Sequence, residues 1–481
     1  MMSAAGGIST ALGQTPGGGV LELPTGDWDS PAIVRKVYLA RYGAGWPGRS
    51  VNIDQEIKEI DAGLTQVEKR YPRRIRFVGG EALLKPDAVT SWTRSVGDVD
   101  GILAIIVSSG TAGDLETIFA LDKPTLVYER LYGGHEWQFP SQASQRGRKV
   151  DVVVSDDYQS LDPYADAFFS IHHLRKSKVL VIAPDRPQFR YGEGYGKQFG
   201  TSFAYPSFET LRASIDKVNG NEAARLADEV IKNAAQVREP PREQTVLAAR
   251  VHLAILEMMR QERANAIAID CIGGHQSMGG GGYPCISFSK LNDQGLYGVC
   301  EGDIDSAMTM LLVTSFSGKP GFITDPIFDT NTNEVIHLHC SSPTAMQGVG
   351  GPGFPYILRG YPYSGDLHAT CIQVLFGGQG PMTLAKFSSP KVFLVSTGEI
   401  NGNTDLDRGC RNKLRTRVSD AHKLLRNWSL VTLATDERPP RAWDFRNETF
   451  EGLHRVVFYG DHVGMIERLG RLTGFRVLRE L

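Results

Sequence analysis

Two carboxylates, Glu301 and Asp325, have the residue type and the spacing for metal chemistry. Glu301 precedes a run with helical spacing, and Asp325 follows 24 residues later, after the strand-like residues 322–323. Ligands of open α/β sheets collect at the carboxyl ends of the strands. We therefore expect both side chains at one edge of such a sheet, where they could chelate a hard cation that prefers oxygen ligands. The structural alternative is that Glu301 caps a helix and Asp325 starts a turn at Pro326.

A helix over residues 304–315 is predicted to hold Glu301 in place. Apolar or small residues recur at positions 304, 307, 308, 311, 312 and 315, which is the spacing of one helix face. Glu301 would then lie at or just before the helix N-terminus, where unpaired N–H groups favour acidic side chains. Asp303 is predicted to cap this helix or to lie in its first turn.

Strands and helices alternate from residue 33 to about residue 317. We expect strands at residues 34–41, 75–78, 101–107, 125–127, 150–154, 178–182 and 266–271, and helices at 53–70, 208–218, 222–234 and 244–263. The segment GILAIIV, residues 101–107, has the unbroken β-branched character of a buried parallel strand. The alternation indicates doubly wound parallel sheets.

From about residue 318 the pattern changes to short strands with Gly and Pro turns, which suggests a β-barrel. The predicted fold class is therefore α/β, with two doubly wound parallel-sheet domains followed by a C-terminal α+β domain that contains a β-barrel. We expect a flexible N-terminal tail (residues 1–30), an N-terminal α/β domain (31–160), a central α/β domain (161–317) and the C-terminal domain (318–481).

The composition is that of an ordinary globular protein and favours neither nucleic acid nor a membrane as partner. Of the 481 residues, 41% are hydrophobic and 22% charged, and the formal net charge is −2. No apolar run approaches about 18 residues. All six cysteines lie after residue 270 without a C-x-x-C pair, which predicts reduced thiols. Residues 3–14 look like the end of an export signal without its basic region, so we expect a cytoplasmic location, with export as the alternative.

The stretch around Glu301 and Asp325 resembles the metal-binding core of the L-fucose isomerase and L-arabinose isomerase superfamily, nearer the fucose branch. In that branch a Glu, an Asp 24 residues later and a His near the C-terminus bind manganese. Here Glu301 lies in EGD, Asp325 follows an apolar strand, and LHRVVFYGDHVGMIERLGRLTGFRVL resembles the segment that carries the His. The resemblance implies that Glu301, Asp325 and His454 bind Mn²⁺ or another divalent metal.

Two more segments extend the resemblance over residues 178–481. FGTSFAYPSFETLRASIDKVNG is similar to the family's middle domain, and GGQGPMTLAKFSSPKVFLVSTGEI is similar to its barrel. The resemblance implies that Gln276, in the Gly-rich loop of residues 273–282, binds substrate hydroxyls; the alternative is a loop without such a contact. His339 is expected to bind substrate or to be a further metal ligand, whereas His337 is expected to point the opposite way and to be structural.

The resemblance also implies a homo-oligomer, a trimer or a hexamer. In this superfamily the N-terminal domain tends to supply residues to the pocket of a neighbouring subunit. Arg41, Trp46 and Arg49, in RYGAGWPGR, could do this, and an exposed loop is the alternative.

The implied activity is that of a sugar isomerase, an intramolecular oxidoreductase that interconverts an aldose and a ketose through an enediol. The substrate would be an open-chain pentose or 6-deoxyhexose. The reaction needs a Lewis acid at the carbonyl and a base that removes and returns a proton. Glu301 or Asp325 would be the catalytic base, and the sequence does not choose between them. The alternative is a non-catalytic sugar-binding or regulatory relative, which would contain no stoichiometric manganese and would ignore EDTA.

Overall fold

The computed structural model describes residues 22–43, 52–186, 189–274, 282–361, 369–404, 408–431 and 453–481. The chain forms two compact units, each considered by itself. The large unit contains residues 22–26, Lys176–Val463 and Val477–Leu481, and the small unit contains Asp27–Arg175 and Gly464–Arg476. The predicted division into three domains remains a prediction. The proposed export-like segment, residues 3–14, lies outside the described residues.

The small unit is built on a parallel sheet of five strands in the order β2-β1-β3-β4-β5. All six residues of β3 are buried, as its unbroken apolar sequence predicts. The elements are η1 (Asp27–Asp29), β1 (Ala32–Leu39), α1 (Ile53–Arg70), β2 (Ile75–Leu83), α2 (Pro86–Thr93), β3 (Gly101–Ile106), α3 (Ala112–Phe119), β4 (Thr125–Glu129), α4 (Gln138–Gln145), β5 (Val150–Val154), η2 (Tyr158–Leu161) and α5 (Asp162–Lys176).

A buried carboxylate, Asp100, joins three segments of the small unit. It accepts hydrogen bonds from the Ile33 N–H at 2.7 Å and from Nε of Arg175 at 2.9 Å, and it lies 2.9 Å from Nδ1 of His172. Nε2 of His172 is 3.0 Å from the Ser30 hydroxyl. Asp100, His172 and Ser30 are thus in contact in the same order as the acid, base and nucleophile of a hydrolase triad. The Ser30 hydroxyl, however, donates to the carbonyl of Asp27 at 2.6 Å. The network is therefore structural.

The small unit also contains most of the last helix, α13 (Val463–Thr473). Nη2 of Arg471 donates to Asp151 at 3.0 Å, and the Arg468 guanidinium lies 4.9 Å from the ring centroid of Tyr164. Residues from two distant parts of the sequence thus complete this unit.

The first half of the large unit is a four-stranded parallel sheet in the order β10-β9-β6-β7, with helices between its strands. The longest of these helices is α9, whose inner face packs into the apolar core beside the sheet. The elements are β6 (Lys178–Ile182), α6 (Gly192–Phe199), β7 (Ser202–Ala204), α7 (Phe208–Asp216), α8 (Gly220–Asn233), β8 (Gln236–Val237), α9 (Arg242–Gln261), β9 (Ala266–Ile269), α10 (Cys285–Asp293), β10 (Tyr297–Cys300) and α11 (Ile304–Ser317).

The second half of the large unit is mainly a seven-stranded sheet in the order β15-β18-β11-β12-β17-β16-β19. The strands β15, β18, β11, β12, β17 and β16 pair in antiparallel fashion. An additional pairing of β15 with β16 closes six of these strands into a circuit. The strands β14, β13 and β8 form a separate small sheet, in the order β14-β13-β8. The elements are β11 (Phe322–Asp329), β12 (Glu334–His339), β13 (Tyr356–Gly360), β14 (Thr370–Val374), β15 (Pro381–Ser389), β16 (Val392–Asn403), β17 (Asn412–Arg417), α12 (Ala421–Val431), β18 (Arg455–Tyr459) and β19 (Arg476–Arg479).

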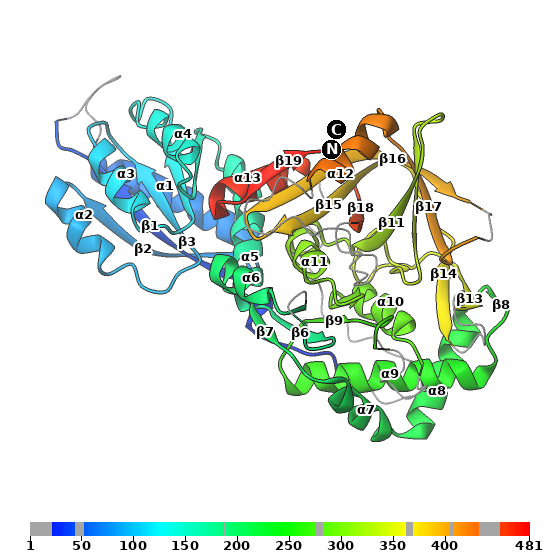
Figure 1. Cartoon of the computed structure of the whole chain (residues 1–481). Helices are drawn as coiled ribbons and strands as arrows, with labels where there is room; N and C mark the ends of the chain where they lie inside the picture. Colours follow the sequence, from blue (N-terminus) through cyan, green and yellow to red (C-terminus); the bar gives the residue numbers. More distant parts are fainter. Residues whose placement is uncertain are drawn as a thin grey trace. The chain divides into compact units, whose positions relative to one another are not determined.

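Helix α11 lies between the two large sheets of this unit (Figure 1). It contacts β9 and β10 of the parallel sheet and β15 and β18 of the antiparallel sheet. Residues 304–315 are all buried, which explains why the helix is apolar on nearly every face. Its N-terminus therefore lies where side chains from both sheets can meet.

The predicted α/β class is confirmed at this coarse level, with two parallel sheets and one seven-stranded sheet. None of the helices in the described parts of the chain has the length and apolar character needed to cross a bilayer.

Candidate metal centre

Glu301 lies in a tight turn between β10 and α11. Both Glu301 and Gly302 have left-handed backbone, with φ of 60° and 66°. This conformation is uncommon for a residue with a side chain, and strained residues of this kind concentrate at functional sites. Asp303 then caps α11, because its Oδ1 accepts the Ser306 N–H at 3.0 Å. The predicted cap is confirmed, and the turn places Glu301 just before the helix.

His454 is held by the same cap. The residue precedes β18, its side chain is buried, and its Nδ1 lies 2.9 Å from Oδ2 of Asp303. Oδ2 also accepts the Ser306 hydroxyl at 2.6 Å and pairs with the buried ammonium of Lys386. A carboxylate beside Nδ1 fixes the proton on that nitrogen, so the neutral ring has its lone pair on Nε2. This nitrogen faces Glu301 and Asp325.

The carboxylate of Glu301 lies between two imidazoles. Its Oε1 is 3.4 Å from Nε2 of His339, and its Oε2 is 3.4 Å from Nε2 of His454. His339 is the last residue of β12, and the two rings meet edge to face with centroids 5.3 Å apart. Glu301, His339 and His454 thus form one cluster with the residue types and separations of a metal site.

Asp325 approaches the cluster from β11. Its Oδ1 lies 3.4 Å from Nε2 of His454. Both atoms are buried, and neither has a hydrogen-bond partner among the residues that the structure describes. A buried polar atom without a partner costs about 1–3 kcal/mol, so two facing atoms of this kind point to a missing ligand between them.

The three 3.4 Å separations suit a shared cation better than direct hydrogen bonds. N–H···O bonds in proteins are about 2.7–3.2 Å long. Two ligand atoms that each lie about 2.1 Å from an ion are about 3.0–3.4 Å apart, for bond angles between about 90° and 109°. The observed spacing lies at the upper end of that range. The donor set therefore fits a divalent ion.

The charges of the cluster favour a positive occupant. Burial opposes the ionisation of Glu301, but the charge of His454 and the neighbouring His339 ring hold the pKa of Glu301 well below its usual value. Burial alone would lower the pKa of His454, yet the charge of Glu301 and the contact with Asp303 raise it to about 10. His339 also has a raised pKa, because its contacts with Cys340 and Glu301 outweigh burial. Without a cation, protons on the two rings supply the positive charge.

Asp325 reaches the cluster by a different route from the one its sequence predicts. We expected it at the carboxyl end of a strand, on the same sheet edge as Glu301; the structure places it in the middle of β11, paired with Leu338. Pro326 does not end the strand, because pairing with β18 stops at Thr324 and β11 has only one neighbour there. The two carboxylates therefore come from two different sheets and meet between them.

The histidines and the remaining site predictions have separate outcomes. The prediction that His337 points away from His339 is wrong, because residues two apart on a regular strand share a face. Its structural role is supported: Nδ1 lies 3.3 Å from the Thr324 hydroxyl and Nε2 2.9 Å from that of Thr416. Gln276, Trp46 and Arg49 lie outside the described residues, so their predicted contacts stay predictions.

Sequence reasoning missed the supporting residues Asp303, Ser306 and Lys386 as parts of the site. Asp303 was recognised only as a helix cap. The available signal for Lys386 was a single charge inside the apolar run of β15, where the side chain is 2% exposed. Buried lysines need a partner of opposite charge, and here that partner is Asp303.

A scan against models of protein families and a search of curated proteins each returned no match for this chain.

Proposed function

We propose that the protein is a divalent-metal-dependent aldose–ketose isomerase that acts on an open-chain pentose or 6-deoxyhexose. The single observation that supports this most is the convergence of Glu301, Asp325, His339 and His454 around one space, where two facing buried atoms have no hydrogen bond to any described residue. Bound there, an ion such as Mn²⁺ would supply the Lewis acid that polarises the sugar carbonyl and holds O1 and O2.

The surrounding side chains fit a divalent ion electrostatically. Glu301, Asp303 and Asp325 contribute three negative charges and Lys386 one positive charge, so with neutral imidazoles the group sums to −2. Asp303 orients His454 through Nδ1 and leaves Nε2 for the ion. The closed circuit of six strands supports the β-barrel that we infer for the C-terminal region, and with it the resemblance to L-fucose isomerase. We also propose that the protein is a homo-oligomer.

Asp325 is the proton-transferring base in this proposal. Both oxygens of Glu301 face imidazole nitrogens, so neither is free to reach a substrate proton. Asp325 directs only Oδ1 towards His454, and its side chain is 26% exposed, compared with 16% for Glu301. Its second oxygen can therefore take the proton from C2 of the aldose and return it to C1 of the enediol.

The test uses the full-length protein, stripped with EDTA and reloaded with Mn²⁺. It is incubated with L-fucose, D-arabinose or L-arabinose in D₂O, and both ketose formation and deuterium incorporation are measured. Ketose with solvent deuterium is expected from at least one sugar. Stoichiometric metal with neither ketose nor deuterium from any of the three sugars would refute the isomerase and favour a sugar-binding protein.

The role of Asp325 is tested with Asp325→Asn at saturating Mn²⁺. Deuterium exchange should fall about 10²- to 10⁴-fold, the usual contribution of a general base. Asp329→Asn is the matched control, because Asp329 lies on the same strand but accepts N–H groups of the turn at Asn331 and Thr332. Full exchange in Asp325→Asn would assign the base elsewhere.

A further inference from the structure

Five buried cysteines gather in the core of the large unit. They come from five different places: two residues after β9, the start of α10, the end of β10, the residue after β12, and β14. All are reduced and belong to one apolar cluster; they are Cys271, Cys285, Cys300, Cys340 and Cys371. Buried thiols often act only as small apolar side chains. The contacts of this group indicate more than packing.

The five thiols form a connected series. Cys300 hydrogen-bonds with both Cys271 and Cys340. Cys285 hydrogen-bonds with both Cys340 and Cys371. Cys300 and Cys340 are therefore neighbours in the series, and each has a further thiol beside it.

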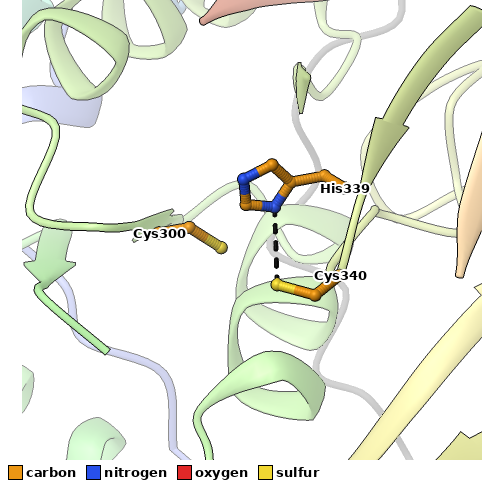
Figure 2. Close-up of side chains that lie close together, drawn as sticks. All are labelled: Cys300, His339 and Cys340. Atoms are coloured by element: carbon orange, nitrogen blue, oxygen red, sulfur yellow. Dashed lines mark hydrogen bonds between the residues drawn. The ribbon is translucent and has the colours of Figure 1, made fainter. Parts of the chain in front are cut away.

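The imidazole of His339 lies close to both of these thiols. Nδ1 of His339 lies 3.5 Å from Sγ of Cys340, and the sulfur of Cys300 points towards the same space (Figure 2). The ligand atoms of Cys300, His339 and Cys340 all lie within 4.8 Å of one another. Two sulfurs and one imidazole nitrogen are the donors that zinc and other thiophilic cations select, whereas Mg²⁺ and Mn²⁺ prefer oxygen.

We propose that Cys300, Cys340 and Nδ1 of His339 form a second metal site, specific for a soft cation of the Zn²⁺ or Cd²⁺ class. Each thiol that binds the cation releases its proton to solvent. Cys271 lies beside Cys300 and Cys285 beside Cys340, so either thiol is placed to supply the fourth ligand of a four-coordinate shell.

The two metal sites share His339, and this makes them antagonistic. Nε2 of His339 faces Glu301 of the first site, and Nδ1 faces Cys340 of the second. A neutral imidazole has one lone pair and one N–H. When Nε2 binds a cation, Nδ1–H can only donate to the Cys340 sulfur; when Nδ1 binds one, Nε2–H can only donate to Glu301. A soft cation in the thiol site therefore removes a ligand from the first site.

The existence of the thiol site is tested with Cd²⁺ as the probe. The full-length, reduced, EDTA-treated protein is titrated while the ultraviolet thiolate-to-cadmium absorption is recorded. One equivalent should saturate the band, and the double variant Cys300→Ser/Cys340→Ser should lose it. Cys410→Ser is the matched control, because Cys410 is also buried but lies outside the five-thiol cluster. An absent band, or a band that survives in the double variant, overturns the site.

Two further measurements keep the test decisive. X-ray absorption of cadmium bound to the unmutated protein should show sulfur together with nitrogen, and an oxygen-only shell overturns the proposal even if the double variant fails to fold. Glu301→Gln should keep the cadmium band, so failure of the proposed isomerase and failure of the thiol site remain distinguishable.

The antagonism is measured by manganese paramagnetic resonance, independently of activity. Cadmium at one equivalent should raise the dissociation constant of Mn²⁺ about 10- to 100-fold, the usual effect of disturbing one ligand. The effect should vanish in Cys300→Ser/Cys340→Ser. Unchanged Mn²⁺ binding at a saturated cadmium band would refute the shared imidazole.

Discussion

Replacing Asp303 with Asn should destabilise the large unit and weaken its metal site at the same time. In the native protein the Asp303 carboxylate receives the Lys386 ammonium, the Ser306 hydroxyl and its N–H, and the His454 ring. Asn can still cap α11 through its carbonyl oxygen, so the loss of the cap contributes little. The main effect is that Lys386, which is 2% exposed, loses its only carboxylate partner within salt-bridge distance among the described residues.

The loss of stability in Asp303→Asn depends on the protonation state that Lys386 adopts. It can remain charged and buried with only the Ser306 hydroxyl, 2.8 Å away, as a hydrogen-bond partner, which costs about 3–5 kcal/mol. It can instead release its proton, which costs about 5 kcal/mol at pH 7, at about 1.36 kcal/mol for each pH unit below its ordinary pKa of 10.5. The free energy of unfolding should therefore fall by about 3–5 kcal/mol at pH 7.

The sign of the pH dependence follows from the same reasoning. In Asp303→Asn the folded-state pKa of Lys386 lies below its unfolded value, because burial already lowers it, Asp303 no longer opposes this, and only the charge of Asp305 still does. The unfolded variant then binds more protons than the folded one, so its stability rises with pH. Relative to the unmutated protein, the deficit should shrink by about 2–3 kcal/mol between pH 7 and pH 9.

The assay is urea unfolding of the metal-free protein, followed by hydrogen exchange of peptides from α11 and β15. Asp303→Asn/Lys386→Met removes both charges and should recover most of the lost stability. It should not recover Mn²⁺ affinity, which we expect to be about 10- to 100-fold weaker in both variants because His454 loses its orienting partner. A deficit that is equal at both pH values, together with unchanged Mn²⁺ affinity, would refute the proposed roles of Lys386 and Asp303.

Three further predictions concern other parts of the chain. Adding Mn²⁺ to the metal-free protein at pH 7.5 should release up to about two protons per ion, because the raised pKa values of His339 and His454 keep both rings protonated until a cation replaces the protons. Calorimetry in buffers of different ionisation enthalpy measures the number of protons released, and a release of zero contradicts the prediction. Gly302→Ala should cost more than the roughly 1–2 kcal/mol of left-handed backbone strain and should weaken Mn²⁺ binding, because a Cβ there also lies 3.1 Å from the Phe189 ring. Gly318→Ala, with a similar φ of 64° and no atom within 4 Å, should cost only about 1–2 kcal/mol and leave metal binding intact. In the small unit, burial and the charge of Glu136 raise the pKa of Glu129 to about 7. The free energy of unfolding of this unit should therefore fall by about 3 kcal/mol as the pH rises from about 4.5 to 7, which urea unfolding measures. Glu129→Gln should abolish this pH dependence.

Features set by neighbouring residues were predictable from the sequence. The helix Ile53–Arg70 has the predicted bounds, because its cap at Asn52 and its apolar spacing are local signals. The cap at Asp303 and the buried strand Gly101–Ile106 were predictable for the same reason. Each depends on contacts within a few positions or on an unbroken apolar run.

The parts that sequence did not predict depend on contacts between distant segments. Asp325 was misplaced because its strand continues only through pairing with β12, which no local pattern around Pro326 reveals. Lys386 and His454 meet Asp303 across 83 and 151 positions. The cysteines have no short spacing, so their gathering depends on how β9, β10, β12 and β14 are brought together by the fold.

Helix α13 has a consequence for the order of events during synthesis. The small unit takes its sheet from the first third of the chain, yet Arg471 and Arg468 reach Asp151 and Tyr164 from the last twenty residues or so. A nascent polypeptide that has left the ribosome only as far as Val463 still lacks these contacts. The small unit therefore lacks the contacts of α13 while some three hundred residues of the large unit are translated. During that time it is the part of the chain for which a chaperone that binds incompletely folded protein would matter most.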